Sequence, residues 1–210
     1  MNLTNFKHWI FDMDGTLTVA IHDFDAIRND LGIPQGKRIL EAIGEMPSEK
    51  AKFLYKRLDE IEMKLTSQTK PQKGALELLS LLKKNNANLG ILTRNNKKNA
   101  QKTLNNCCFS DFFKPEYILG RESVEPKPNP DGIYQLLKLW NADPKDTVMV
   151  GDHQMDVEAG SLAGTFTIFL NKHGNSAKFE HSGLTISNLN ELLVFLNPKL
   201  IKDRYKSKRH

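Results

Sequence analysis

The sequence predicts a three-layer α/β fold, in which helices cover both faces of a parallel sheet, with a small helical segment inserted after the first strand. After Gly74, short apolar runs alternate with helical patterns, and this alternation is typical of a parallel sheet covered on both faces. The first apolar run, residues 9–11, ends directly at two closely spaced acids. Residues 18–70 show helical periodicity and no convincing strand.

The inserted helical segment is predicted from the spacing of its apolar residues. Phe24, Ile27 and Leu31 recur at helical spacing until Gly32 interrupts the pattern. A longer amphipathic pattern begins after Pro47. Three helices are therefore expected, over residues 24–31, 37–43 and 48–65.

The later part of the chain supplies the remaining strands and helices of the sheet. Helices are expected over residues 75–83, 97–104, 130–140 and 155–162, and from near 188 through 195. Strands are expected over residues 88–92, 117–119, 147–150 and 166–170, with an edge strand over 184–186. The first four of these strands each follow a helix along the chain, which favours parallel pairing.

The chain divides into a core, a cap and a tail. The core is expected to comprise residues 1–17 and 71–198, and the cap residues 18–70. Residues 199–210 carry six basic side chains and one acid, which is the whole net charge of +5. Because the excess charge is confined to this tail, the body is not a basic surface, and a nucleic-acid partner is disfavoured. A terminal run of this kind is typical of a mobile tail.

Composition indicates a soluble protein outside membranes. Hydrophobic residues make up 39% and charged residues 26% of the chain, and no apolar stretch approaches the ~20 residues that cross a bilayer. The N-terminus lacks a signal-peptide pattern, so the expected location is the cytoplasm. The two cysteines, Cys107 and Cys108, are adjacent, which predicts neither a disulfide framework nor a zinc site.

Asp12 and Asp14 form the most informative pair in the chain. Residues two apart in an extended backbone point to the same side, so both carboxylates are expected to face one spot past the first strand. Two acids this close repel unless a cation or a shared proton lies between them. Gly15 permits a sharp turn beside them. Taken alone, the pattern also fits an ordinary turn; an EF-hand calcium loop is disfavoured because its later oxygen ligands are missing.

Other polar residues follow the other predicted strands. Thr93 follows one strand, and Asp152 follows another, with Asp156 four residues on. Lys127 lies between two prolines that stiffen its loop. Each residue has an ordinary explanation alone, such as a helix cap or a surface lysine. Since ligands of open α/β sheets lie beyond the carboxyl ends of the strands, together they predict one catalytic pocket.

Four segments of the chain resemble the four ordered motifs of the haloacid dehalogenase (HAD) superfamily. They are FDMDGTL at residues 11–17, LTRN at 92–95, KPNPD at 127–131 and GDHQMD at 151–156. The resemblance runs from about residue 7 to residue 170 and implies a Rossmann-like core. The helical segment after the first motif is similar to the small cap of the phosphoglycolate-phosphatase-like branch, which lies over the active site.

The resemblance implies a Mg²⁺-dependent phosphatase. Asp12 would attack phosphorus and form an aspartyl-phosphate, and Asp14 would act as general acid and base. Thr93 would hold a phosphoryl oxygen and Lys127 would offset negative charge, with Asn95 also in the substrate site. The metal would be held by Asp12, the backbone carbonyl of Asp14, Asp152 and Asp156, and such oxygen ligation favours Mg²⁺.

Several alternatives stay open at this point. The Asp-x-Asp form is similar to phosphatases and phosphomutases, which disfavours dehalogenation. Hydrolysis of a small phosphomonoester, phosphoglycolate or another phosphorylated metabolite, is preferred over a sugar phosphomutase, for which His22 is a weak cap candidate, and over a non-catalytic binding module. Arg94 is either a substrate-binding residue for a second anionic group or a solvated residue, and His153 is either a rim residue or a ligand. The sequence does not decide between a monomer and a dimer.

Overall fold

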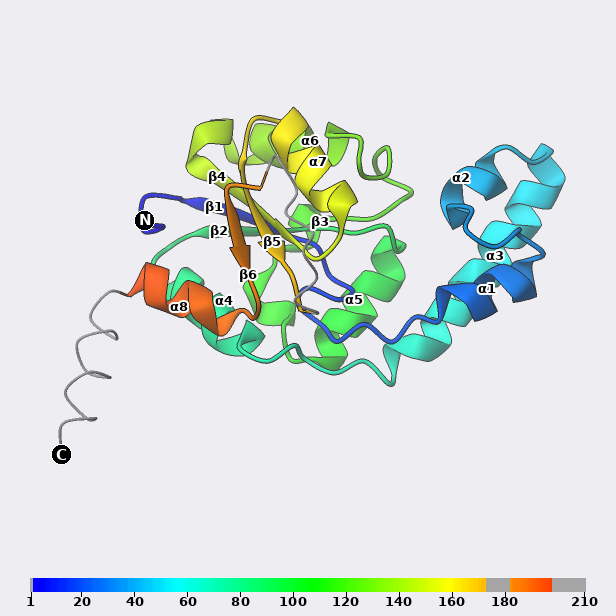
Figure 1. Cartoon of the computed structure of the whole chain (residues 1–210), viewed down its shortest axis with the longest axis horizontal. Coiled ribbons are helices and arrows are strands. Elements are labelled where there is room, and N and C mark those ends of the chain that lie inside the picture. Colours follow the sequence, from blue (N-terminus) through cyan, green and yellow to red (C-terminus); the bar gives the residue numbers. More distant parts are fainter. Residues whose placement is uncertain (1, 173–181, 198–210) are drawn as a thin grey trace.

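The computed structural model describes residues 2–172 and 182–197, and six parallel strands in them form one sheet. The strand order is β3-β2-β1-β4-β5-β6, and the expected parallel α/β fold is confirmed (Figure 1). The basic tail predicted at 199–210 lies outside the described residues. The strands are β1 (His8–Phe11), β2 (Asn88–Leu92), β3 (Ile118–Leu119), β4 (Thr147–Gly151), β5 (Phe166–Leu170) and β6 (Leu184–Ile186).

Helices cover both faces of this sheet (Figure 1). One face packs against α4 (Ala75–Lys84), α5 (Lys97–Asn106) and α8 (Asn190–Leu196), and the other packs against α6 (Asp131–Trp140) and α7 (Gln154–Leu162).

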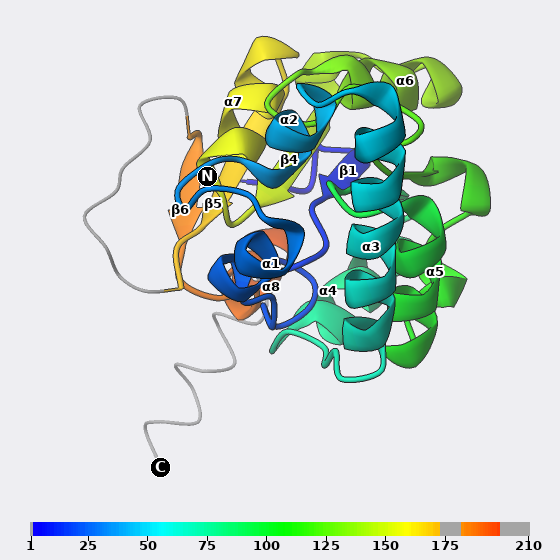
Figure 2. The ribbon, with the colours of Figure 1, turned by 90° about the vertical axis from the view of Figure 1, so that its right-hand side faces the viewer.

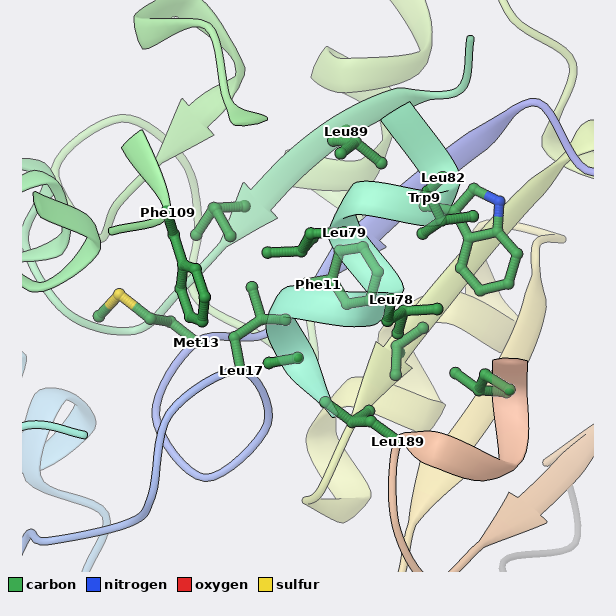
Figure 3. Packing of buried hydrophobic residues seen from close by; sticks show 14 of the residues in the cluster. Trp9, Phe11, Met13, Leu17, Leu78, Leu79, Leu82, Leu89, Phe109 and Leu189 are labelled. Atoms are coloured by element: carbon green, nitrogen blue, oxygen red, sulfur yellow. The ribbon is translucent and has the colours of Figure 1, made fainter. Parts of the chain in front are cut away.

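The strands alternate their side chains between these two layers. Trp9 and Phe11 belong to the cluster with α4, whereas Ile10 between them packs with α6 and α7. Figure 3 shows the first cluster, where Leu78 and Leu79 of α4 lie against β1. All five side chains have no exposed surface, so the central strand is buried on both faces, as its uninterrupted apolar run predicts.

Residues 18–70 form three helices with a hydrophobic cluster of their own. They are α1 (Phe24–Leu31), α2 (Ile39–Gly44) and α3 (Ser48–Thr66), and they lie at one end of the sheet (Figure 1). Ile27, Leu31, Ile43 and Leu58 are buried together. Phe24, expected on the same apolar face, is instead 54% exposed and stacks on His22, because the cluster begins one turn later.

Two connecting segments, which run antiparallel and are hydrogen-bonded to each other, join this helical segment to the core. The Val19 N–H donates to the Lys70 carbonyl at 2.9 Å, and the Gln72 N–H donates to the Leu17 carbonyl at 2.8 Å. Beyond this pair, α3 runs beside α5 of the core (Figure 2). Arg121, which follows β3, joins the two parts through ion pairs with Asp59 and Glu62 of α3.

Small differences from the predicted boundaries have local causes. β3 begins one residue later than expected, because Pro115–Tyr117 forms a 3₁₀ turn before it; further 3₁₀ turns are Ser110–Phe112 and Pro144–Asp146. Both cysteines are free, with Cys107 buried at the end of α5 and Cys108 exposed. Among the described helices, none combines the length and apolar character that a bilayer crossing requires.

Candidate active site

Three neighbouring strands end side by side, and a polar residue follows each of them. Asp12 comes directly after β1, Thr93 after β2, and Asp152 after β4. Because β2, β1 and β4 are adjacent and parallel, their carboxyl ends share one edge of the sheet, where α/β proteins bind ligands. The structure thus brings together residues separated by up to 140 positions in the sequence.

The turn after β1 packs closely against the end of β4. Gly15 has a φ of +95°, and a Cβ atom at this position would lie 2.3 Å from Asp152 Oδ2. Glycine is therefore needed both for the backbone conformation and for the close approach. The Thr16 hydroxyl donates to Asp152 Oδ1 at 3.2 Å, which fixes that carboxylate beside the turn that bears Asp14.

Three carboxylates form a cluster with the properties of a cation site. Asp12, Asp152 and Asp156 each offer an oxygen, and these oxygens lie within 4.8 Å of one another. In residues 2–172 and 182–197, this is the one group of acids, histidines or cysteines so arranged. The donors are all charged oxygens, so they fit a hard divalent cation such as Mg²⁺ rather than a softer metal.

Burial and mutual repulsion place this cluster under electrostatic strain. Burial raises the pKa of Asp156 to about 7, although the charge of Lys127 opposes the shift. The pKa of Asp152 is raised first by burial and then by the charge of Asp12. Charged carboxylates in such surroundings are stabilised by a nearby cation, which agrees with the donor chemistry.

Lys127 places a positive charge inside the carboxylate cluster. Its side chain is only 2% exposed, and its Nζ lies 2.7 Å from Asp12 Oδ1 and 2.6 Å from Asp156 Oδ1. Burial alone would lower the pKa of Lys127, but the two carboxylates more than offset this effect and raise it. The lysine is therefore charged, and it links the end of β1 with the first turn of α7.

Asp14 lies on the same turn as Asp12 but has a different environment. Its Oδ2 accepts a hydrogen bond of 3.4 Å from Asn95 Nδ2. Burial, followed by the charge of Asp12, raises the pKa of Asp14 to about 7. A carboxyl group with such a pKa can both hold and release a proton near neutral pH.

The residues after β2 are also buried and interlinked. Thr93 is 4% and Asn95 6% exposed, and Thr93 Oγ1 accepts the Asn95 N–H at 3.1 Å. Asn95 thereby connects the threonine with Asp14. Both side chains lie where the sequence predicted them, at the sheet edge that carries the acids.

Arg94 is not the freely solvated residue that the sequence allowed. Its Nη1 donates to the backbone carbonyl of Lys127, and its Nη2 pairs with Glu41 Oε2 at 2.7 Å. Glu41 belongs to α2 (Ile39–Gly44), so this ion pair attaches the helical segment directly beside the cluster. The pair is only partly buried, with the arginine side chain 21% and the glutamate side chain 37% exposed.

His153 is a helix cap. The ring nitrogen Nδ1 of His153 accepts the backbone N–H of Met155 at 3.2 Å. The backbone N–H of His153 donates to Asp156 Oδ2 at 3.0 Å. Burial lowers the pKa of His153, in keeping with an acceptor nitrogen. The histidine thus positions the backbone that carries Asp156, and it is not a member of the carboxylate cluster.

Three residues of this region were missed in the sequence. Lys172 follows β5 and pairs with Asp152, Arg121 follows β3 and pairs with α3, and Glu41 pairs with Arg94. Arg121 and Lys172 each stand two residues after a strand, so their positions carry the same sequence signal as those of Asp12, Thr93 and Asp152. Nothing in the sequence distinguishes Glu41 from the other acids of the helical segment.

Comparison with known proteins agrees with this fold. Residues 9–170 match the haloacid dehalogenase-like hydrolase family. An uncharacterised hydrolase of Saccharomyces cerevisiae is 32% identical over 201 residues, which cover 92% of each chain. Phosphoglycolate phosphatase 1 of Pseudomonas aeruginosa is 26% identical over 215 residues, which cover 88% of this chain and 77% of the relative. The crystal structure of a HAD hydrolase of family IA, variant 3, from Entamoeba histolytica has a TM-score of 0.76 at 20% identity and covers 89% of this chain and 95% of its own.

The fold and the site define an α/β protein whose acidic and basic side chains meet at the carboxyl ends of β2, β1 and β4. The chain belongs to the haloacid dehalogenase-like hydrolase family. The expected resemblance to this superfamily, and to its phosphoglycolate-phosphatase-like branch, is confirmed.

Proposed function

We propose that this hydrolase is a Mg²⁺-dependent phosphatase that cleaves small phosphomonoesters through an aspartyl-phosphate. One observation carries the proposal: the Lys127 ammonium lies between Asp12 and Asp156 at 2.7 and 2.6 Å, beside a second acid, Asp14, on the same turn. The arrangement brings together a carboxylate held in position (Asp12), a group that can carry a proton (Asp14) and a fixed positive charge (Lys127) in one site. Phosphoryl transfer requires mainly such positioning and charge stabilisation.

In the first step, a carboxylate oxygen of Asp12 attacks phosphorus, and the bond from phosphorus to the ester oxygen breaks. Lys127 holds Asp12 Oδ1, so the carboxylate meets the phosphoryl group in a fixed orientation. Protonated Asp14 gives its proton to the departing oxygen, which leaves as an alcohol. The product on the enzyme is an aspartyl-phosphate, and Asp14 is then ionised.

In the second step, a water molecule attacks phosphorus of the aspartyl-phosphate. Asp14 accepts the proton of this water, the bond from phosphorus to Asp12 breaks, and inorganic phosphate leaves. Both acids return to their starting states. Asn95 supports the exchange because its amide donates to Asp14 Oδ2 at 3.4 Å, and the Thr93 hydroxyl and the Lys127 ammonium are assigned to the phosphoryl oxygens.

The metal site is assigned to the cluster that fits a hard cation. Asp12, Asp152, Asp156 and the backbone carbonyl of Asp14 would hold Mg²⁺, which when bound offsets negative charge on the carboxylates and the phosphoryl group.

A synthetic aryl phosphate tests the reaction class. We expect the protein to release phosphate from 4-nitrophenyl phosphate with Mg²⁺ present, and excess EDTA should lower the rate by about 100-fold or more. Undiminished activity in EDTA would contradict the metal assignment. Faster transfer of phosphate within a sugar phosphate than release to water would favour a phosphomutase, and inactivity across a panel of phosphate esters would favour a binding module.

We further propose that residues 18–70 act as a cap over the core and that Arg94 binds a second anionic group of the substrate. Arg94 already holds a carboxylate, that of Glu41 on α2, at 2.7 Å, and its other nitrogen is anchored on the Lys127 backbone. A small substrate that carries a carboxylate as well as a phosphate would take the place of Glu41. The expected substrate class is therefore a small phosphorylated metabolite of the phosphoglycolate kind.

Two matched esters test this assignment. Phosphoglycolate and ethyl phosphate are close in size, but only the first carries a carboxylate. Arg94→Gln should lower kcat/KM for phosphoglycolate by about 10- to 100-fold, the range of a lost charge-assisted hydrogen bond, and should change kcat/KM for ethyl phosphate by less than about 3-fold. Glu41→Gln is the matched control, since it removes the competing carboxylate and should lower KM for phosphoglycolate. Equal losses on both esters after the arginine substitution would refute the assignment.

A further inference from the structure

Lys172 places a second ammonium group in the carboxylate cluster. It lies two residues beyond β5, and its Nζ is 2.9 Å from Asp152 Oδ2. The same nitrogen donates to the backbone carbonyl of Gly15, in the turn that bears Asp14. The lysine and Asp152 side chains are 21% and 19% exposed, so this contact lies at the mouth of the cluster, whereas Lys127 lies at its base.

The two lysines form ion pairs with different carboxylates of the cluster. Lys127 pairs with Asp12 and Asp156, and Lys172 pairs with Asp152. Together with Asp14, the site holds four carboxyl groups and two ammonium groups, so the fully ionised cluster has two negative charges in excess. This excess equals the charge of one divalent cation. Without Lys172, the fully ionised cluster would have three negative charges in excess.

Two roles for this lysine predict opposite effects on metal binding. If Lys172 only orients Asp152, its loss would leave a candidate ligand poorly placed and would weaken metal binding. If its charge is what matters, its loss would remove a repulsive neighbour and strengthen binding. The remaining contacts of Asp152 favour the second role, because Thr16 Oγ1 holds Oδ1 at 3.2 Å and Gly15 packs against the same carboxylate. The orientation of Asp152 therefore does not depend on Lys172 alone.

We propose that Lys172 is a resident counter-ion of Asp152 that lowers the affinity of the cluster for a divalent cation. The inference builds on the metal site of the proposed function and adds a residue that tunes it. Like charges a few ångströms apart repel strongly in a partly buried site, and an ammonium bound to a ligand oxygen draws negative charge away from a metal. In the metal-free protein, the same ammonium offsets part of the repulsion among the acids.

Binding of Mg²⁺ and Mn²⁺, followed by titration calorimetry without substrate, tests this inference. Lys172→Met should bind both ions at least about 10-fold more tightly than wild type, because it loses a like charge near the ion. Lys172→Arg, which keeps the charge, should bind them within about 3-fold of wild type. The rise in melting temperature on addition of Mg²⁺ should be larger for Lys172→Met, since a tighter ligand stabilises the folded state more.

Lys172→Gln provides a second neutral variant in case the methionine variant does not fold. Equal or weaker binding by the neutral variants, with wild type binding normally, would overturn the inference and leave the proposed phosphatase intact. If neither wild type nor the neutral variants bind either ion, the inference falls together with the metal site, and the EDTA experiment on aryl phosphate hydrolysis identifies that outcome separately.

Discussion

Asp12→Asn is expected to lower the rate of phosphate release from 4-nitrophenyl phosphate by about 10⁴-fold or more, which is the scale seen when a nucleophile is removed. The amide of asparagine has nearly the shape of the carboxylate but lacks its nucleophilic charge, so no aspartyl-phosphate forms. The fold should survive, because Lys127 keeps its 2.6 Å ion pair with Asp156. Steady-state kinetics in saturating Mg²⁺, together with circular dichroism, would measure both effects.

Asp111→Asn is a matched control for this change. Asp111 lies exposed in a 3₁₀ turn on the surface, and the same change of charge there should alter the rate by less than about 2-fold, as is usual for exposed positions. If Asp12→Asn kept more than about a tenth of wild-type activity, Asp12 would not be the nucleophile. If it lost activity only because it unfolded, the dichroism spectrum would reveal this.

The sheet and the central site residues were predictable because they depend on local patterns. The apolar run before Asp12 identifies a strand buried on both faces, and the run before Asp152 does the same. Once two such strands are known to be parallel, their carboxyl ends must share an edge. The position of each acid then follows from chain order alone, without knowledge of side-chain packing.

The contacts between the helical segment and the core were not predictable in this way. Arg121 pairs with Glu62 across 59 positions of the chain, and Arg94 pairs with Glu41 across 53. Such partners depend on how α2 and α3 are docked, and a single sequence gives no measure of that geometry. Phe24 is a related case: periodicity placed it on an apolar face, but the cluster of α1 begins at Ile27.

Lys127→Met is expected to destabilise the metal-free protein by about 3–5 kcal/mol, the usual range when one partner of a buried ion pair is removed. The substitution keeps much of the side-chain volume but leaves Asp12 and Asp156 buried without their shared ammonium. Urea denaturation in EDTA would measure the free energy of unfolding. The rate of aryl phosphate hydrolysis should also fall by about 10²- to 10³-fold, because a fixed charge at the reacting group is lost.

Lys84→Met, at an exposed position near the end of α4, is the control and should change stability by less than about 0.5 kcal/mol. The double variant Lys127→Met with Asp156→Asn separates charge from packing. If unpaired charge is the cause, removal of one carboxylate should return at least about 1 kcal/mol of the lost stability, a non-additive result typical of residues in contact. If the losses in the free energy of unfolding caused by the two substitutions simply add, the effect of Lys127 is due to its packing. The ion pairs of its ammonium with the two acids would then not be the source of its stabilising effect.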